Sequence, residues 1–233
     1  DVDGFDAAAK IAILASIAFN SRVTLDQVPT EGIRSLAASD IEYANEIGYT
    51  VKLLAIARRT DKGIDVRVHP TMIPSGHPLA SVNGVYNAIY VVGDAVGETM
   101  FFGEGAGAGA AASAVVGDVL EVARALDAGN KVVGCTCVDN LPIRPMSELE
   151  DRYYVRIIVD DKPGVLASTA ATFAQHGVSV ESLIQRCPRG KDSAELVYVT
   201  HRATEACMTE AFEAIRQLDA VQSIAAVIRV EDI

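Results

Sequence analysis

Apolar residues recur with helical spacing in two segments near the start of the chain. Residues 5–19 (FDAAAKIAILASIAF) contain no Gly or Pro and are rich in Ala, Ile and Leu, which predicts a mostly buried helix. Residues 39–47 (SDIEYANEI) predict a second helix, with Ser39 as the candidate N-cap and Gly48 as the residue that ends it.

The hydrophobic period then changes from helical to strand-like. Short apolar runs bounded by Gly, Pro and Asp turn signals predict consecutive strands, and hence an antiparallel or mixed sheet. The expected strands are residues 50–58, 64–73, 86–93 and 97–102. A Gly-Ala loop at 103–109 follows, and then an Ala/Val-rich helix over 110–127 that Gly129 closes.

The rest of the chain has a different order of predicted elements. Residues 131–150 hold two prolines and a charged tail, which is typical of a linker. From about 153 onward the pattern is strand, helix, strand, strand, helix, strand, with a turn around Gly190 between the two middle strands. This βαββαβ order predicts a ferredoxin-like module. The fold class is therefore α+β, with domains over 1–130 and 151–233 joined by a linker over 131–150.

Composition narrows the class of protein. The chain has 233 residues, half of them hydrophobic, enough for one large or two small cores without disulfides. A net charge of −11 argues against nucleic acid or an anionic membrane as partner. Four cysteines form no disulfide framework and no zinc pattern, so we expect thiols in a cytoplasmic protein without a metal site.

The apolar segments argue against a membrane-spanning helix and against a signal peptide. No apolar run reaches the roughly 18–20 residues that span a bilayer. The apolar run after Lys10 follows the acidic residues Asp1, Asp3 and Asp6, whereas a signal peptide begins with basic ones. Because the sequence starts without Met and directly on a helical pattern, we expect further sequence upstream.

Asp6 and Lys10 form the first candidate for chemistry. Four residues apart, they lie on one face of the first helix. A surface ion pair is the simple interpretation. The alternative is a lysine that lines a cleft, where partial desolvation would let it act as acid or base while the carboxylate holds it in position.

The loop GEGAGAG at 103–109 follows a strand and opens a helix, a position where backbone N–H groups attract anions. It fits the loose G-x-G-x-x-A dinucleotide pattern by composition. No acidic residue follows at the end of a next strand at the right distance, so the loop does not predict a Rossmann unit. A loop closing over a ligand held by another domain and a tight helix–sheet contact both remain open.

The turn DKPG at 161–164 opens the C-terminal module. The helix that begins behind it could receive the carboxylate of a small ligand, or the turn could be a plain strand–helix connection. The four histidines (His69, His77, His176 and His201) form no ligand cluster, and each is expected to be structural.

Two blocks together resemble a known family. The stretches DVDGFDAAAKIAIL (1–14), EGI (31–33), DIEYANEIGYTVKLLA (40–55), HPLASVNGVYNAI (77–89) and GEGAGAGAAASAVVGD (103–118) resemble, in order, the substrate-binding and catalytic half of homoserine dehydrogenase. Residues 161–167 (DKPGVLA) and the βαββαβ order resemble an ACT domain, the usual C-terminal partner of that enzyme.

The resemblance implies NAD(P)-dependent interconversion of L-aspartate 4-semialdehyde and L-homoserine, in threonine and methionine biosynthesis. It implies that Lys10 acts at the reacting oxygen, with Asp6 and Asp1 holding the amino-acid substrate. The cofactor contacts implied in this chain are Gly103, Gly105, Ala106 and Gly107. For a threonine effector in the ACT domain, the implied residues are Asp161, Gly164, Val165, Leu166 and Ser179.

The sequence also departs from the family pattern. Glu104 and the pair Ala110-Ala111 stand where other residues are commoner, and Ser179 replaces an Asn frequent in amino-acid-binding ACT domains. The Rossmann half, with most cofactor contacts and a further lysine, is absent from these residues, so we expect no turnover by this chain alone. Exposed sheet edges predict a homo-oligomer. The alternative function is an amino-acid-sensing or oligomerisation module without catalysis.

Overall fold

The computed structural model describes residues 1–129, 134–187 and 193–232. They form two compact units, one of residues 1–74 and 137–233 and one of residues 75–136. The second is called the hairpin unit below. Each unit is described by itself.

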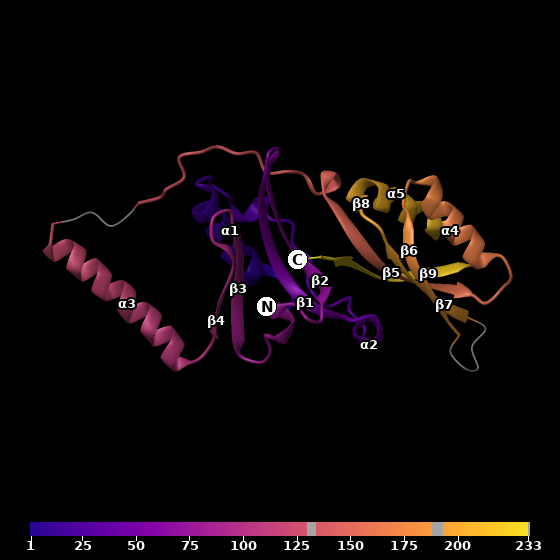
Figure 1. The fold of residues 1–233 in the computed structure, drawn as a ribbon, viewed down its shortest axis with the longest axis horizontal. Coiled ribbons are helices and arrows are strands. Elements are labelled where there is room, and N and C mark those ends of the chain that lie inside the picture. Colours follow the sequence, from indigo (N-terminus) through magenta and orange to yellow (C-terminus); the bar gives the residue numbers. More distant parts are fainter. Residues whose placement is uncertain (130–133, 188–192, 233) are drawn as a thin grey trace. The chain divides into compact units, whose positions relative to one another are not determined.

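The first unit is built on one sheet with strand order β1-β2-β9-β5-β7-β6 (Figure 1). All neighbours pair antiparallel except β2 and β9, which run parallel. The strands are β1 (Tyr49–Thr60), β2 (Gly63–Pro74), β5 (Glu150–Asp160), β6 (Val180–Arg186), β7 (Ser193–Thr200) and β9 (Val221–Val230), and the two-residue β8 (Ala203–Thr204) pairs with β5.

The C-terminal module (residues 150–232) follows the expected βαββαβ order. Helices α4 (Val165–Gln175) and α5 (Glu205–Arg216) lie on one face of its four strands. Their apolar faces bury Phe173, Met208 and Ile215 against Tyr153 and Tyr198 of the strands. The order β9-β5-β7-β6 is that of a ferredoxin-like fold, so this part of the predicted fold class is confirmed.

The N-terminal module (residues 1–74) packs α1 (Phe5–Phe19) on the hairpin of β1 and β2. The helix spans the predicted residues, but it is not mostly buried. Ala8, Ile11, Ala12 and Ala15 are buried on one face, whereas Phe5, Ile13, Leu14 and Ile17 are exposed, because only one side of α1 meets the sheet.

Helix α2 (Ala38–Glu46) begins one residue earlier than predicted, and Ser39 is not its N-cap. Ala37 is the capping residue, and its backbone N–H donates to the Asp40 carboxylate over 3.1 Å. Asp40, at the third helical position, thus accepts the N–H of the N-cap residue, which is one of the two bonds of a capping box. Helix α2 packs Ala44 and Tyr43 against Tyr154, Val197 and Ile228 of the C-terminal module.

The predicted linker is in part ordered against the N-terminal module. Leu141 N–H donates to the Ser21 hydroxyl over 2.8 Å, and Ile64 exchanges backbone hydrogen bonds with Pro142 and Arg144. A short 3₁₀ turn, η3 (Met146–Glu148), leads directly into β5. Residues 131–133 of the predicted linker and the expected turn around Gly190 lie outside the described residues.

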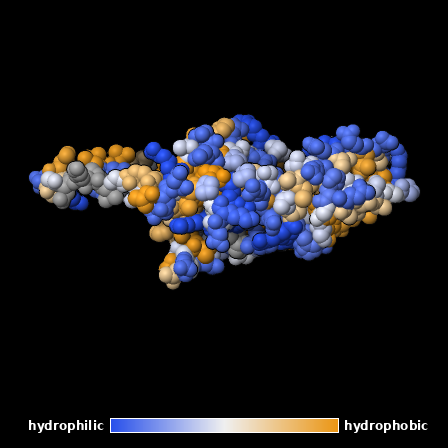
Figure 2. Space-filling view, turned by 90° about the horizontal axis from the view of Figure 1, so that it is seen from above, coloured by the Kyte–Doolittle hydropathy of each residue, from blue (hydrophilic) through white to orange (hydrophobic). Residues whose placement is uncertain are grey.

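The hairpin unit holds the other predicted elements. Strands β3 (Tyr86–Gly93) and β4 (Gly97–Glu104) pair antiparallel, and α3 (Ala108–Asp127) follows them. None of the residues of α3 is buried, and Figure 2 shows apolar side chains along it. In the described residues, no helix combines the length and the apolar character needed to cross a bilayer.

Candidate functional site

Residues 1–4 form the turn that leads into α1. Gly4 precedes the helix with φ = 81°, and its N–H donates to the Asp1 carbonyl over 3.0 Å. A Cβ at Gly4 would lie 2.9 Å from the Thr30 Cγ2, so a larger residue would push the turn off its support. This turn sets Asp6 in the first turn of α1, where the helix dipole favours a carboxylate.

Asp6 and Lys10 are brought together as the spacing predicts. Lys10 Nζ lies 2.6 Å from Asp6 Oδ2, and the ammonium holds the pKa of the Asp6 carboxyl below its usual value. Both side chains are largely exposed, 63% for Lys10 and 52% for Asp6. In the described residues the pair therefore stands on the surface, without the desolvation that a closed cleft would supply.

The face of α1 that carries this pair is otherwise apolar. Ile13, Leu14 and Ile17 follow Lys10 at three, four and seven residues and are exposed. Side chains at these intervals share one side of a helix. A charged pair beside an exposed apolar stripe is typical of a surface that another part of a protein covers.

The loop of residues 29–34 supports the turn ahead of α1. Ile33 N–H donates to the Val2 carbonyl over 2.9 Å, and Arg34 pairs with Asp3 over 2.5 Å. The backbone of Gly32 lies so close to Val2 that a Cβ would approach its carbonyl oxygen to 2.4 Å. The sequence pattern predicted no separate role for the stretch EGI (31–33). The close contact with Val2 explains why residue 32 is a glycine.

The Gly-Ala loop lies in the hairpin unit, between β4 and α3. Gly105 has a structural reason to be small, because a Cβ there would overlap the Asn87 amide at 1.8 Å. Gly103 and Gly107 face open space, and Gly107 precedes α3 with φ = 126°. Ala106 lies between these glycines, ahead of the helix.

This loop fits the nucleotide cofactor that the resemblance implies. The first amides of α3 lack acceptors within the helix, and Gly103 and Gly107 leave the backbone uncovered where a flat or anionic group could approach. Glu104 ends β4 directly before this loop and places a carboxylate beside it.

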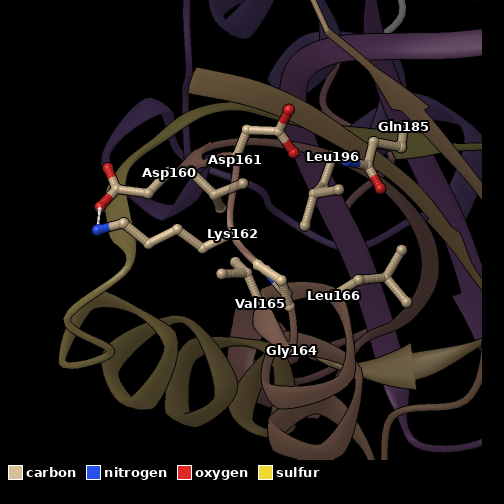
Figure 3. A pocket seen from close by; sticks show the side chains of 10 residues that line it. Asp160, Asp161, Lys162, Gly164, Val165, Leu166, Gln185 and Leu196 are labelled. Carbon is tan, nitrogen blue, oxygen red and sulfur yellow. Dashed lines mark hydrogen bonds and ion pairs between the residues drawn. The ribbon is translucent and has the colours of Figure 1, made fainter. Parts of the chain in front are cut away.

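A hollow lies in the C-terminal module, at the turn between β5 and α4 (Figure 3). Its volume is about 350 Å³. Gly164 precedes α4 with φ = 91°, and the first amides of the helix lie beside the hollow. Val159, Val165 and Leu196 give it an apolar floor, and Asp161 and Lys162 line its polar side.

Four of the five residues predicted for an effector line this hollow, namely Asp161, Gly164, Val165 and Leu166. Ser179 is not among its lining residues; its backbone carbonyl accepts from His201 N–H. Gln185, missed by sequence reasoning, donates its amide to Asp161 over 3.4 Å. Asp160 also lines the hollow, and Lys162 bonds it over 2.7 Å and lowers the pKa of that carboxyl.

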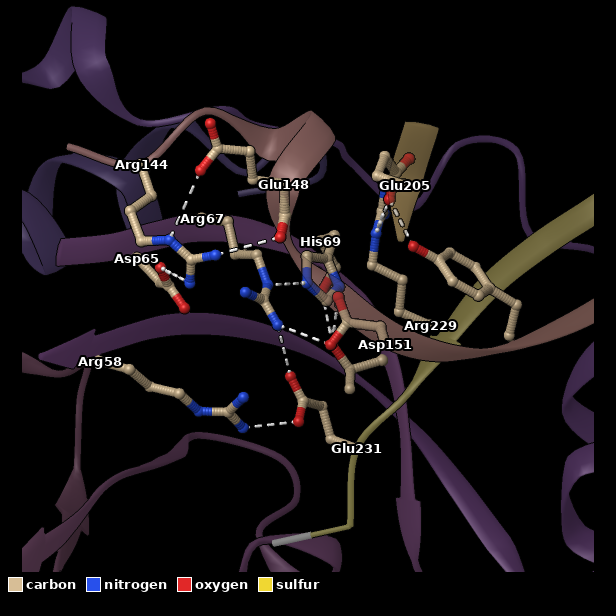
Figure 4. A network of polar contacts seen from close by, with 12 residues as sticks. Arg58, Asp65, Arg67, His69, Arg144, Glu148, Asp151, Glu205, Arg229 and Glu231 are labelled. Carbon is tan, nitrogen blue, oxygen red and sulfur yellow. Dashed lines mark hydrogen bonds and ion pairs between the residues drawn. The ribbon is translucent and has the colours of Figure 1, made fainter. Parts of the chain in front are cut away.

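A buried polar network joins the two modules (Figure 4). Arg67 of β2 bonds Asp151 and Glu231 of the C-terminal module, each over 2.8 Å, and donates to His69 Nε2 over 3.0 Å. Burial raises the pKa of Asp151, and one of its oxygens has no partner among the described residues. The signal for this network in the sequence is the set of charged residues inside apolar strands, which pattern analysis did not use.

Fold and site together define a class: an α+β module with an exposed Asp–Lys pair on its first helix, joined to a ferredoxin-like module that contains a hollow of small-molecule size. Comparison with known proteins makes this specific. The family profile described as homoserine dehydrogenase matches residues 1–120, and that of the ACT domain matches residues 153–220. The chain belongs to the homoserine dehydrogenase family.

Individual relatives agree with the family match. The chain is 46% identical to a homoserine dehydrogenase of Synechocystis sp. and 45% to one of Corynebacterium glutamicum, over 99% of its residues in both. It covers 55% and 53% of those proteins. The chain thus spans about half the length of these curated relatives.

Solved structures give the same picture. The crystal structure of a homoserine dehydrogenase from Thiobacillus denitrificans superimposes with a TM-score of 0.91 at 39% identity, covering 100% of this chain and 54% of that one. For the Staphylococcus aureus homoserine dehydrogenase at pH 7.0 the TM-score is 0.67 at 30% identity, with 55% of that chain covered.

Proposed function

We propose that the protein containing this chain catalyses the NAD(P)-dependent interconversion of L-aspartate 4-semialdehyde and L-homoserine. Family membership supports this, and the observation that carries it is the Lys10–Asp6 pair on an exposed, partly apolar helix face. The apolar stripe of Ile13, Leu14 and Ile17 supports a covering domain there, which would contribute most of the cofactor site.

In this proposal, Lys10 serves the reacting oxygen. Its ammonium donates a hydrogen bond to the carbonyl and stabilises the alkoxide that develops in the reduction. Asp6 holds the ammonium in place, and Asp1 with Asp6 binds the ammonium group of the amino-acid substrate. NAD(P), when bound, supplies or accepts the hydride, and Gly103, Gly105, Ala106 and Gly107 are its contacts in this chain.

Homoserine oxidation tests the proposal directly. The chain is joined to the half of the Synechocystis homoserine dehydrogenase that it does not match, and homoserine-dependent NAD(P) reduction is measured. Lys10→Ala should lower kcat by 10²-fold or more, because the alkoxide loses its charged donor. Lys62→Ala, which removes an exposed lysine from the turn after β1, is the control and should match the parent.

Two results would contradict the proposal. One is a Lys10→Ala variant with parental kcat. The other is a folded hybrid that shows no homoserine-dependent reduction of NAD(P), together with a 233-residue chain that shows no chemical-shift change when it is titrated with homoserine. The chain alone should show no turnover in the same assay.

For the C-terminal module we propose an amino-acid effector, with threonine as the first candidate. The first amides of α4 would receive its carboxylate, and Asp161 would receive its ammonium group. Calorimetry with threonine should give saturable heat that Asp161→Ala abolishes and Asp219→Ala, a surface control, retains. The absence of heat at millimolar threonine would leave only a role in assembly.

A sensing or oligomerisation module without catalysis is the second candidate function. One observation favours it: the hollow in Figure 3 is formed entirely by residues of the C-terminal module. Saturable threonine binding, combined with a hybrid that lacks homoserine oxidation, would support this candidate over the enzyme.

We also propose that the protein is a homo-oligomer that works in the cytoplasm. A two-stranded hairpin is marginal alone, and α3 exposes Val115, Val119, Val122 and Leu126 along one side. A second copy of the same surface would bury these residues. In sedimentation analysis, Val119→Glu combined with Leu126→Glu should therefore reduce the oligomer, whereas the outward change Glu121→Lys should not.

A further inference from the structure

Arg229 of β9 connects the C-terminal module to the loop that supports the start of α1. Its guanidinium bonds both oxygens of Glu205, at the start of α5, over 2.7 and 3.1 Å (Figure 4). The remaining nitrogen, Nη1, reaches Glu31 of the N-terminal module over 3.0 Å. The Arg229 side chain is only 10% exposed, so its position is fixed by these two carboxylates.

Glu31 continues this connection through the backbone. Its N–H donates to the Val68 carbonyl over 2.8 Å, and the next two residues touch the turn ahead of α1. Gly32 lies against Val2, and Ile33 donates to the Val2 carbonyl. A shift of Glu31 therefore moves the surface on which residues 1–4 rest.

Apolar packing does not fix this part of the loop. A cavity of about 230 Å³ lies beside the ion pair, lined by Pro29, Thr30 and Glu31 and by the charged side chains of Arg67, Glu205 and Arg229. The loop bonds Val68 of β2 through the backbones of Pro29 and Glu31, and the Arg229–Glu31 ion pair ties it to the C-terminal module.

We propose that Arg229 is a positioning residue for the substrate-binding segment of residues 1–6, acting through Glu31 and the loop of residues 29–34. Through it the regulatory module sets the geometry of the carboxylates that hold the substrate. The functional half of this inference rests on the proposed function of Asp1 and Asp6, whereas the positioning itself does not.

Hydrogen exchange in the 233-residue chain tests the positioning without any activity. Arg229→Gln should speed exchange of the Ile33 and Gly4 amides tenfold or more, because their acceptors on residues 1 and 2 lose a fixed support. Glu31→Gln should speed the same exchange, and combining it with Arg229→Gln should raise the exchange rates little further. Arg229→Lys, which keeps the charge, should restore part of the protection.

Arg152→Gln is the matched control. Arg152 is 13% exposed, lies on β5 of the same module and pairs with Asp232 and Glu181, but it does not contact Glu31. The loss of Arg152 should leave the hydrogen-exchange rates of the Ile33 and Gly4 amides unchanged. The proposal is overturned if Arg229→Gln leaves both amides unchanged, or speeds exchange equally in the strands of the C-terminal module, as a general loss of stability would.

Kinetics of the hybrid enzyme test the link to substrate. Arg229→Gln should raise the KM for homoserine fivefold or more with kcat within twofold, while Arg152→Gln changes neither. Faster exchange with an unchanged KM would refute the link between loop and substrate. A hybrid without homoserine oxidation would refute the proposed function instead, and the exchange result would still decide the positioning.

Discussion

His69 shows how a single buried residue acquires a fixed protonation state. Arg67 donates to its Nε2, so the ring proton lies on Nδ1, which donates to the Pro70 carbonyl over 3.0 Å. Burial, together with the positive charges of Arg229 and Arg67, holds the pKa of His69 well below its ordinary value. A second proton would have to displace the arginine, so the ring stays neutral in the folded protein.

This predicts a loss of stability in mild acid. The unfolded chain takes up a proton on His69 near pH 6.5, whereas the folded chain does not, so the stabilisation is complete above that pH and is lost as pH falls below it. Between pH 7 and 5.5 the free energy of unfolding should fall by about 1 kcal/mol from this residue. Urea unfolding at both pH values measures the fall.

Comparing variants isolates the contribution of His69. His69→Gln should unfold more easily at pH 7 but should lose less stability on going to pH 5.5. Equal pH dependence in His69→Gln and the parent would contradict the assignment.

At the scale of residues, local spacing predicted the Asp6–Lys10 contact, because four residues on a helix fix two side chains on one face. The Arg229–Glu31 contact was not predictable in the same way. It joins residues 198 positions apart, and only the parallel pairing of β2 with β9 brings them together. Ser179 is not among the residues that line the hollow, and its role in an effector site, implied by resemblance alone, stays a prediction.

At the scale of elements, the hairpin of β1 and β2 depends on a close approach by the chain that follows the hairpin unit. Gly63 begins β2 with φ = 132°, and a Cβ there would lie 2.2 Å from the Pro142 carbonyl oxygen. Ile64 N–H donates to the same oxygen over 2.8 Å. The turn therefore anchors the segment that precedes the C-terminal module.

Gly63→Ala should destabilise the first unit by about 2 kcal/mol, because the new methyl group meets backbone in a conformation that L-residues rarely adopt. The midpoint of urea unfolding, followed by circular dichroism, measures the change. Gly76→Ala serves as control, since a Cβ at Gly76 meets nothing within 4 Å and its φ is not positive. A loss at Gly63 no larger than that at Gly76 would contradict the steric argument.

Helices and strands were predictable to within a few residues where a strong period ends at a turn signal, as at Gly63, Gly129 and Gly164. Ends set by tertiary contact were not. Strand β5 begins at Glu150, three residues earlier than expected, because Glu150 and Asp151 pair with β8. The exposed side of α1 was also missed, since an Ala-rich sequence does not show which apolar residues meet a neighbour.

At the scale of the whole molecule, the N-terminal and C-terminal modules share one sheet, and one core cluster contains residues of both modules. Residues Thr71 and Met72 of β2 pair with Arg229 and Val230 of β9. Helix α2 covers the face of the C-terminal sheet opposite α4 and α5, with Asp40 fully buried against Arg156 over 2.7 and 3.0 Å. Sequence patterns predicted the separate modules but contained no sign of this shared core, because it depends on long-range pairing.

The shared core predicts that residues 1–74 and the C-terminal module unfold together. Asp40→Ala should lower the free energy of unfolding of this joint transition by about 3 kcal/mol, because Arg156 is left buried without its carboxylate. Differential scanning calorimetry should show one transition for both modules in the parent chain, and hydrogen exchange should assign the same opening free energy to Ile64 and Tyr154. Replacing both partners, Asp40→Leu with Arg156→Met, should restore part of the loss, since no buried arginine is left without the Asp40 carboxylate, although the Tyr154 hydroxyl still loses its acceptor. Separate transitions for the two modules in the parent would show that α2 and the β2–β9 pairing contribute little to their cohesion.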